Sequence, residues 1–277
     1  MQEWTLATGT REVLLRVCEW PGDGPPVVVL HGFLEQGAAW DAVATRLGRR
    51  VIAPDQRGHG RSGHVGTGGF YHFWDYVSDL DALVAHLGGT VDLIGHSMGG
   101  TVAALFAACR PETIRRLVLV EGLGPADTTD DPVRHAVRFL DHRRRPSRHP
   151  VFADVTAARQ RIQLYNPHLP DAVAQRLGAR GSRPIAGART WAWDARHRMR
   201  NPTPFSGSQF KCFLQRITAP TLLVSGGKST FTLPDHAERA AQILDATAVV
   251  LPDSGHLLHH DAPAALAEAI RAHLVAA

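Results

Sequence analysis

The sequence predicts an α/β fold: a doubly wound, mostly parallel sheet with helices on both faces and a helical cap inserted into it. Apolar runs of strand length alternate along the chain with segments whose apolar residues repeat at helical spacing. Several of these runs are continuously apolar, as in strands buried on both faces of a parallel sheet. A long Arg- and Pro-containing segment, about 126–210, interrupts the alternation and predicts the cap.

The first half of the chain contains five expected strands, 12–17, 26–32, 50–55, 91–95 and 116–122. A short helical stretch precedes the third. Between the third and the fourth, apolar residues recur at steps of 4, 3, 4 and 3, which predicts one buried helix face: Phe73, Val77, Leu80, Val84 and Leu87. A helix of small residues is expected directly after Met98.

The last part of the chain returns to the same alternation. Strands are expected at 220–226 and 248–255, and helices at about 234–244 and 262–275. We therefore assign residues 1–125 and 211–277 to the sheet domain and residues 126–210 to the helical cap.

Composition and termini limit the class of protein. Of the 277 residues, 44% are hydrophobic and 20% charged, as in an ordinary globular chain. The N-terminus does not read as a signal peptide, and no apolar run reaches the roughly 18 residues that would span a bilayer. Three widely separated cysteines predict reduced thiols rather than disulfides or a zinc site. We expect a cytoplasmic protein without membrane insertion.

The net charge of +4 is unevenly distributed. Residues 130–205 contain 15 Arg, no Lys, six Asp and no Glu, an excess of nine positive charges, so the rest of the chain carries a net −5. We interpret the cap as having a solvated basic surface. The preference for Arg over Lys is explained equally well by genomic base composition.

The stretch "SGGKST", Ser225 to Thr230, resembles the end of a phosphate-binding P-loop. The P-loop pattern requires a glycine five residues before Gly227, and that position is Leu222, inside a predicted strand. We therefore expect no nucleotide site here, and no nucleic-acid partner.

The stretch "IGHSMGG" carries the strongest chemical signal. Gly95, Ser97 and Gly99 match the pattern G-x-S-x-G, with a predicted strand before it and a predicted helix after it. In that context the serine lies on a sharp turn that exposes its hydroxyl at the carboxyl edge of the sheet. Ser97 is the predicted nucleophile.

A serine needs a base to remove its proton, and the chain contains sixteen histidines. His256 follows the last predicted strand, in a loop that meets the same sheet edge as Ser97, and is the predicted base. His259 and His260 fall at a helix start, and we interpret them as solvent-facing or capping residues.

An oxyanion also requires hydrogen-bond donors. The loop after the strand 26–32 reaches the same edge, so the backbone amides of Phe33 and Met98 are the predicted pair. Met98 begins a helix, where the helix dipole favours negative charge.

These motifs, with "HGF" and "DQRGHGRS", resemble the α/β-hydrolase superfamily, specifically its capped, lipase- and esterase-like members. The resemblance covers about residues 10–275 and is weakest in the cap. It implies an eight-stranded sheet and a Ser–acid–His triad in that chain order. Superfamily epoxide hydrolases and haloalkane dehalogenases have Asp where this chain has Ser97, which argues against both activities. It also implies a structural role for the loop containing Asp55 and His59.

The acid departs from the superfamily pattern. Similar proteins often carry Asp after the strand that here is 220–226, and this chain has Ser229 there. Asp235, the next acid, is six positions too late for the loop. Some members carry the acid at the end of the strand after the nucleophile helix, which predicts Glu121. Asp253 is the alternative.

The resulting prediction is a serine hydrolase acting on a small-molecule carboxylic ester or related acyl bond through an acyl-serine intermediate, with no metal or organic cofactor. Two alternatives stay open. The site could serve a C–C bond hydrolase, a perhydrolase or a biosynthetic cyclase, or the fold could bind a ligand without catalysis.

Aromatic residues of the cap are candidate walls of a substrate pocket: Tyr165, Trp191, Trp193 and Phe205. They could equally pack the cap onto the sheet domain. The sequence does not indicate an oligomeric state.

Overall fold

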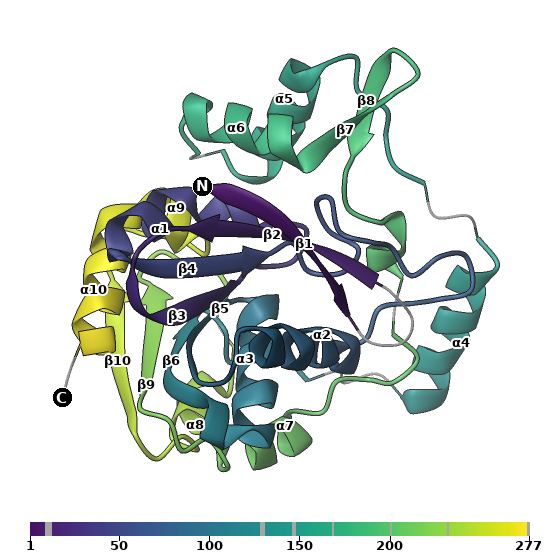
Figure 1. The fold of residues 1–277 in the computed structure, drawn as a ribbon. Coiled ribbons are helices and arrows are strands. Elements are labelled where there is room, and N and C mark those ends of the chain that lie inside the picture. The colour runs from purple at the N-terminus through teal and green to yellow at the C-terminus, as the bar shows by residue number, and fades with distance from the viewer. Residues whose placement is uncertain are drawn as a thin grey trace.

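An eight-stranded sheet lies between two layers of helices, with the cap above it (Figure 1). The computed structural model describes residues 1–8, 13–127, 131–145, 148–167, 169–199, 201–231 and 233–275. The strand order is β1-β2-β4-β3-β5-β6-β9-β10. Only β1 and β2 pair antiparallel with their neighbours, so the predicted mostly parallel sheet is confirmed.

The strands of the sheet are β1 (Gln2–Thr8), β2 (Val13–Trp20), β3 (Asp23–Leu30), β4 (Arg49–Pro54), β5 (Val91–His96), β6 (Ile114–Val120), β9 (Thr221–Gly226) and β10 (Ala246–Leu251). Seven of them were predicted individually. β1 was not, because it lies at the edge of the sheet and most of its residues are exposed.

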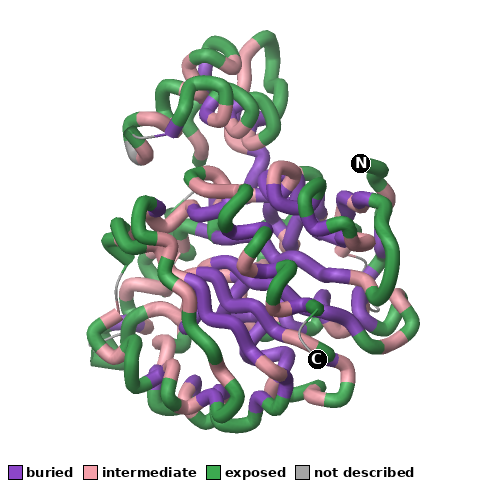
Figure 2. The backbone as a smooth tube through the Cα atoms, turned by 90° about the vertical axis from the view of Figure 1, so that its left-hand side faces the viewer, coloured by how far each residue is buried: buried purple, intermediate pink, exposed green. Residues whose placement is uncertain are grey.

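The sheet separates two apolar cores, and this explains its continuously apolar strands. In β3, Val28 and Leu30 face one core while Val27 and Val29 face the other. Figure 2 shows the buried residues concentrated in these strands. The helices of the first core are α2 (Phe73–His86), α3 (Met98–Cys109) and α7 (Gly207–Leu214); those of the second are α1 (Asp41–Leu47), α9 (Leu258–Asp261) and α10 (Pro263–Val275).

The predicted cap segment contains α4 (Pro132–Arg143), which lies beside the sheet domain in Figure 1. It also contains α5 (Val155–Tyr165) and α6 (Asp171–Gly181), which lie above the sheet with a hairpin of β7 (Ser182–Ile185) and β8 (Ala188–Trp191). The insertion is therefore not purely helical. The two-residue turn of the hairpin, Ala186–Gly187, has φ values of 41° and 78°, which suits a right-twisted hairpin.

Two boundaries near the C-terminal half differ from the expected ones. α7 begins at Gly207, four residues before the expected start of the last sheet-domain segment, and packs on α3. Of the helix expected at 234–244, only α8 (His236–Ala240) is α-helical, and it is followed by turns that lead into β10. No helix among the described residues is long and apolar enough to cross a bilayer.

The carboxylate of Asp55 joins two loops at the edge of the sheet that carries Ser97. Asp55 is 4% exposed and accepts hydrogen bonds from the amides of Gly37 (2.8 Å) and Arg61 (2.9 Å). Gly60 packs against it so closely that an added Cβ would lie 2.1 Å from the carboxylate. Asp55 therefore holds the loops after β3 and β4 together.

We expect Asp55→Ala to lower the free energy of unfolding by about 2–4 kcal/mol, because two amides lose their acceptor inside the protein. Urea unfolding measures this change. Asp81→Ala is the matched control, since Asp81 pairs with Arg110 at the surface and such pairs contribute about 1 kcal/mol or less. Equal losses in the two variants would contradict a structural role for Asp55.

Candidate active site

Ser97 occupies a strained turn between β5 and α3. Its backbone has φ 52° and ψ −115°, a region that residues with side chains rarely adopt. The flanking chain must be glycine: a Cβ on Gly95 would lie 2.4 Å from the Gly99 carbonyl oxygen, and one on Gly99 would lie 2.4 Å from the Leu30 oxygen. The close packing turns the serine side chain out of the sheet edge and into a cavity.

His256 lies in the loop after β10 and faces Ser97. The Ser97 hydroxyl is 3.0 Å from His256 Nε2, within hydrogen-bonding distance. The ring of Phe231 stacks on the imidazole, with centroids 4.5 Å apart and planes inclined by 29°. The imidazole is thus held in a defined orientation while its side chain stays 24% exposed.

Glu121 follows β6 and also has a positive φ, 50°. One carboxylate oxygen, Oε2, is 3.2 Å from His256 Nδ1 and accepts a hydrogen bond from the Ser229 hydroxyl at 2.8 Å. The other, Oε1, accepts from the Gly226 amide at 2.8 Å. Ser229 therefore supports the carboxylate of Glu121, the group that faces the imidazole.

The surroundings of Glu121 favour its ionised form. Burial opposes ionisation, but the hydrogen bonds from His256, the Gly226 amide and Ser229 hold the pKa of the carboxyl below its usual range. A negative charge is therefore present beside His256 at neutral pH.

Lys228 and Asp253 form an ion pair at the surface. Lys228 Nζ lies 2.9 Å from Asp253 Oδ1, and the two side chains are 64% and 89% exposed. Lys228, the lysine of "SGGKST", therefore pairs with an acidic residue in the loop after β10. The carboxylate of Asp253 points into solvent.

The cavity above Ser97 has a volume of about 310 Å³. Phe33 and Met98, the residues of the predicted donor amides, line it together with Ser97. Met98 is the first residue of α3, where backbone amides have no partner within the helix. Aromatic rings make up much of the remaining wall.

Some of these wall residues carried no signal in the sequence. His197 and Tyr71 line the cavity and stack with ring centroids 3.8 Å apart. Burial lowers the pKa of His197 to about 3, so this ring is neutral. The Tyr71 hydroxyl donates to Asp194 at 2.9 Å. Tyr71 and His197 are far apart in the chain, and nothing in their local sequence indicates a pocket.

A second cavity of about 610 Å³ lies between the cap and the sheet domain. Trp191 and Trp193 line it, and Phe33 lines both cavities. Phe205 is not among the described residues that line either one; it packs between Phe73 and Phe210. The side chain of Tyr165 lies outside the described residues.

His259 and His260 do not face solvent, which corrects the prediction. The side chain of His259 is fully buried, and that of His260 is 6% exposed. His259 stacks on Trp40, with centroids 4.9 Å apart and planes inclined by 2°. The short helix α9 turns both rings inward, toward the carboxylate of Glu35.

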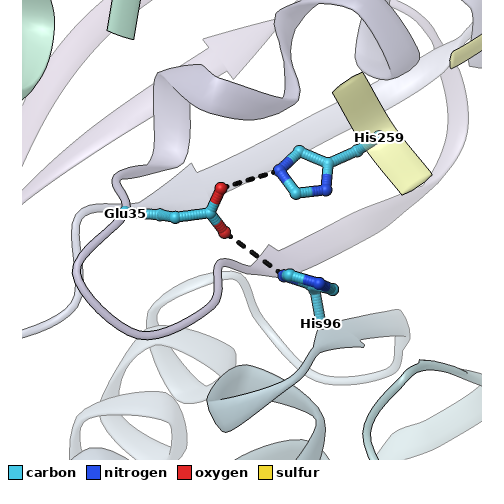
Figure 3. Close-up of side chains that lie close together, drawn as sticks. All are labelled: Glu35, His96 and His259. Carbon is cyan, nitrogen blue, oxygen red and sulfur yellow. Dashed lines mark hydrogen bonds and ion pairs between the residues drawn. The ribbon is translucent and has the colours of Figure 1, made fainter. Parts of the chain in front are cut away.

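Glu35, His96 and His259 form a buried group that we call the Glu35 cluster (Figure 3). Burial lowers the pKa of His259 to about 3, so its ring is neutral. Burial opposes ionisation of Glu35, but the interaction with His259 and the surrounding hydrogen bonds hold its pKa well below the usual range. Sequence reasoning did not identify this cluster.

The family model described as "Alpha/beta hydrolase family" matches residues 27–269. The chain belongs to the alpha/beta hydrolase family.

Relatives of this alpha/beta hydrolase carry hydrolase names. A serine hydrolase-like protein of Danio rerio is 30% identical over 90% of this chain and 81% of its own length. The 2-(acetamidomethylene)succinate hydrolase of Mesorhizobium japonicum is 27% identical over 90% and 87%. A solved thioesterase domain from the curacin biosynthetic pathway superposes with a TM-score of 0.87 at 35% identity, covering 98% of this chain and 99% of that one. The family and these names support hydrolase activity.

We expect Asp253→Asn to leave kcat/KM of this hydrolase within about twofold, because an exposed ion pair contributes little to either stability or orientation. Steady-state kinetics on an ester substrate measure the effect. A loss of several orders of magnitude would instead show that Asp253 takes part in the reaction.

Proposed function

We propose that this chain is a serine hydrolase that cleaves a carboxylic ester or thioester bond through an acyl-Ser97 intermediate. The observation that carries the proposal is the continuous chain of contacts from Ser97 Oγ to His256 Nε2 (3.0 Å) and from His256 Nδ1 to Glu121 Oε2 (3.2 Å). A nucleophile, a base and an orienting acid in this geometry are the elements of a serine triad.

In the acylation step, Ser97 Oγ attacks the substrate carbonyl carbon while His256 Nε2 accepts the hydroxyl proton. The negative charge of Glu121 stabilises the resulting imidazolium and fixes the proton on Nδ1. The amides of Phe33 and Met98 donate to the oxyanion, with support from the dipole of α3. The tetrahedral intermediate collapses, the C–O or C–S bond breaks, and His256 returns the proton to the leaving alcohol or thiol.

Deacylation repeats these steps with water. His256 removes a proton from water as its oxygen attacks the acyl carbon, and the proton then returns to Ser97 Oγ as the acid product leaves. The ring of Phe231 covers one face of the imidazole and helps to keep Nε2 directed at Ser97 Oγ.

Glutamate suits the position because the acid comes from β6, one strand away from the usual site after β9. Its carboxylate reaches the loop after β9, where the Gly226 amide and the Ser229 hydroxyl bind it. Both oxygens are thereby fixed, which holds Oε2 toward His256. The end of β9 and the loop after it thus supply the hydrogen-bond donors, and the end of β6 supplies the charged carboxylate.

The choice of bond rests on the relatives and on the cavity. The 35% identical neighbour is a thioesterase domain, which favours a thioester over an amide. The 310 Å³ cavity is lined mostly by apolar and aromatic residues, which suits an acyl group of modest size. The substrate is therefore a small-molecule acyl compound.

Ser97→Ala should reduce kcat/KM by about 10⁴-fold or more, as loss of a triad nucleophile does in other serine hydrolases. The measurement is hydrolysis of a p-nitrophenyl ester and of an N-acetylcysteamine thioester, with circular dichroism as the folding control. A fluorophosphonate should label the wild type at Ser97 and leave the variant unlabelled. Activity retained in the folded variant would end the acyl-serine proposal.

Glu121→Gln keeps the shape of the acid and removes its charge; the equivalent change in a serine protease triad costs about 10⁴ in kcat. We expect a loss of similar order here. Adding Ser229→Asp should restore part of the activity, because it returns a carboxylate beside the Oε2 position. Ser229→Asp alone is the control, since it sets two carboxylates against each other and should not raise activity. Near-normal turnover of Glu121→Gln would place the acid elsewhere.

A further inference from the structure

The Glu35 cluster gathers three potential metal ligands from three separate elements. Glu35 lies in the loop after β3, His96 ends β5, and His259 lies in α9. The side chains are 13%, 1% and 0% exposed. Figure 3 shows the carboxylate of Glu35 with one oxygen directed at each ring. His96 Nδ1 is 3.2 Å from Oε2, and His259 Nε2 is 2.9 Å from Oε1.

The hydrogen bonds of His96 decide which of its ring nitrogens faces the cluster. Its Nε2 lies 2.8 Å from the carbonyl oxygen of His256, which only accepts, so Nε2 carries a proton. The other ring nitrogen, Nδ1, is 3.2 Å from Glu35 Oε2. Nδ1 is therefore the atom that His96 offers to an ion bound at the cluster.

His96 also has the arrangement of a metal-binding histidine. Metal ligands of this type usually donate their other ring N–H to a carbonyl or a carboxylate, which fixes the tautomer and the ring. The carbonyl of His256 does this for His96. Trp40 fixes His259 by stacking, and the Gly32 amide donates to Glu35 Oε2 at 3.0 Å. All three ligands are oriented by their neighbours.

The cluster lies beside a cavity. Glu35 forms part of the wall of the 610 Å³ cavity between the cap and the sheet domain. In our proposal an ion, and a water molecule as its fourth ligand, reach the cluster from the Glu35 side.

We propose that Glu35, His96 and His259 form a binding site for a divalent transition-metal ion, with Zn²⁺ as the best fit. One ligand atom from each residue lies within 4.8 Å of the others. Two imidazoles and one carboxylate are ligands that Zn²⁺ accepts in tetrahedral sites, at about 2.0–2.2 Å. Small shifts of these side chains toward a common centre complete the coordination. The site adjoins the triad, because His96 precedes Ser97 and contacts the His256 carbonyl. Its ligands are not triad residues, and the proposal does not depend on the proposed function.

The test is calorimetric titration of the metal-free protein with Zn²⁺. We expect one tight site in the wild type. Glu35→Gln and His259→Asn should each lower the Zn²⁺ affinity by more than the roughly 10–100-fold that loss of an outer-shell partner costs. Co²⁺ in place of Zn²⁺ should give the visible absorption of a tetrahedral site. His236→Asn, at an exposed histidine of α8, is the control for surface binding and should leave the affinity unchanged.

A second variant separates the cluster from the triad. His256→Ala removes the catalytic imidazole but keeps the backbone carbonyl that holds His96, so tight binding should survive. The proposal is overturned if His256→Ala no longer binds Zn²⁺, or if Glu35→Gln and His259→Asn both bind it with unchanged affinity. It is also overturned if the wild type binds Zn²⁺ no more strongly than surface histidines do. Anomalous diffraction from wild-type crystals soaked in Zn²⁺ locates the ion without relying on any variant, and an ion away from the cluster overturns it as well.

Discussion

The close approach of backbone segments at four glycines is the constraint on which the site depends. Gly95 brings the end of β5 against the start of α3, and Gly99 brings the start of α3 against the end of β3. Gly100 and Gly122 bring α3 against the end of β6, where a Cβ on Gly100 would lie 2.4 Å from the Gly122 Cα. In the sequence, Ser97 lies between Gly95 and Gly99, and Glu121 directly precedes Gly122. Both have positive φ, so the packing that joins the elements also turns the two side chains toward the loop that carries His256.

Much of the sheet domain could be predicted because its signals are local. Buried parallel strands are continuously apolar, and the turn around Ser97 has a short, specific pattern. His256 and Glu121 could be placed from strand ends, because parallel strands bring their carboxyl ends to one edge. The contact of Glu121 with Gly226 then follows from the register of β6 and β9.

The features that could not be predicted depend on contacts between distant residues. Glu35 and His259 are 224 positions apart, and a histidine near a helix start looks the same whether it faces solvent or a buried carboxylate. The burial of His259 is decided by Trp40, which comes from a third segment. The hairpin in the cap was missed for a different reason: its strands have four residues each, too few for a periodic signal.

Phe33 joins two properties that are usually treated separately. Its ring is 47% exposed and lies in the wall shared by the 310 Å³ and 610 Å³ cavities, while its amide is one of the two proposed oxyanion donors. Phe33 therefore lines both cavities with its side chain and offers a donor to the reacting oxygen with its backbone amide. Cavity size and stabilisation of the transition state are therefore coupled in this protein. The side chain that limits the cavities and the amide that donates to the oxyanion are attached to the same Cα.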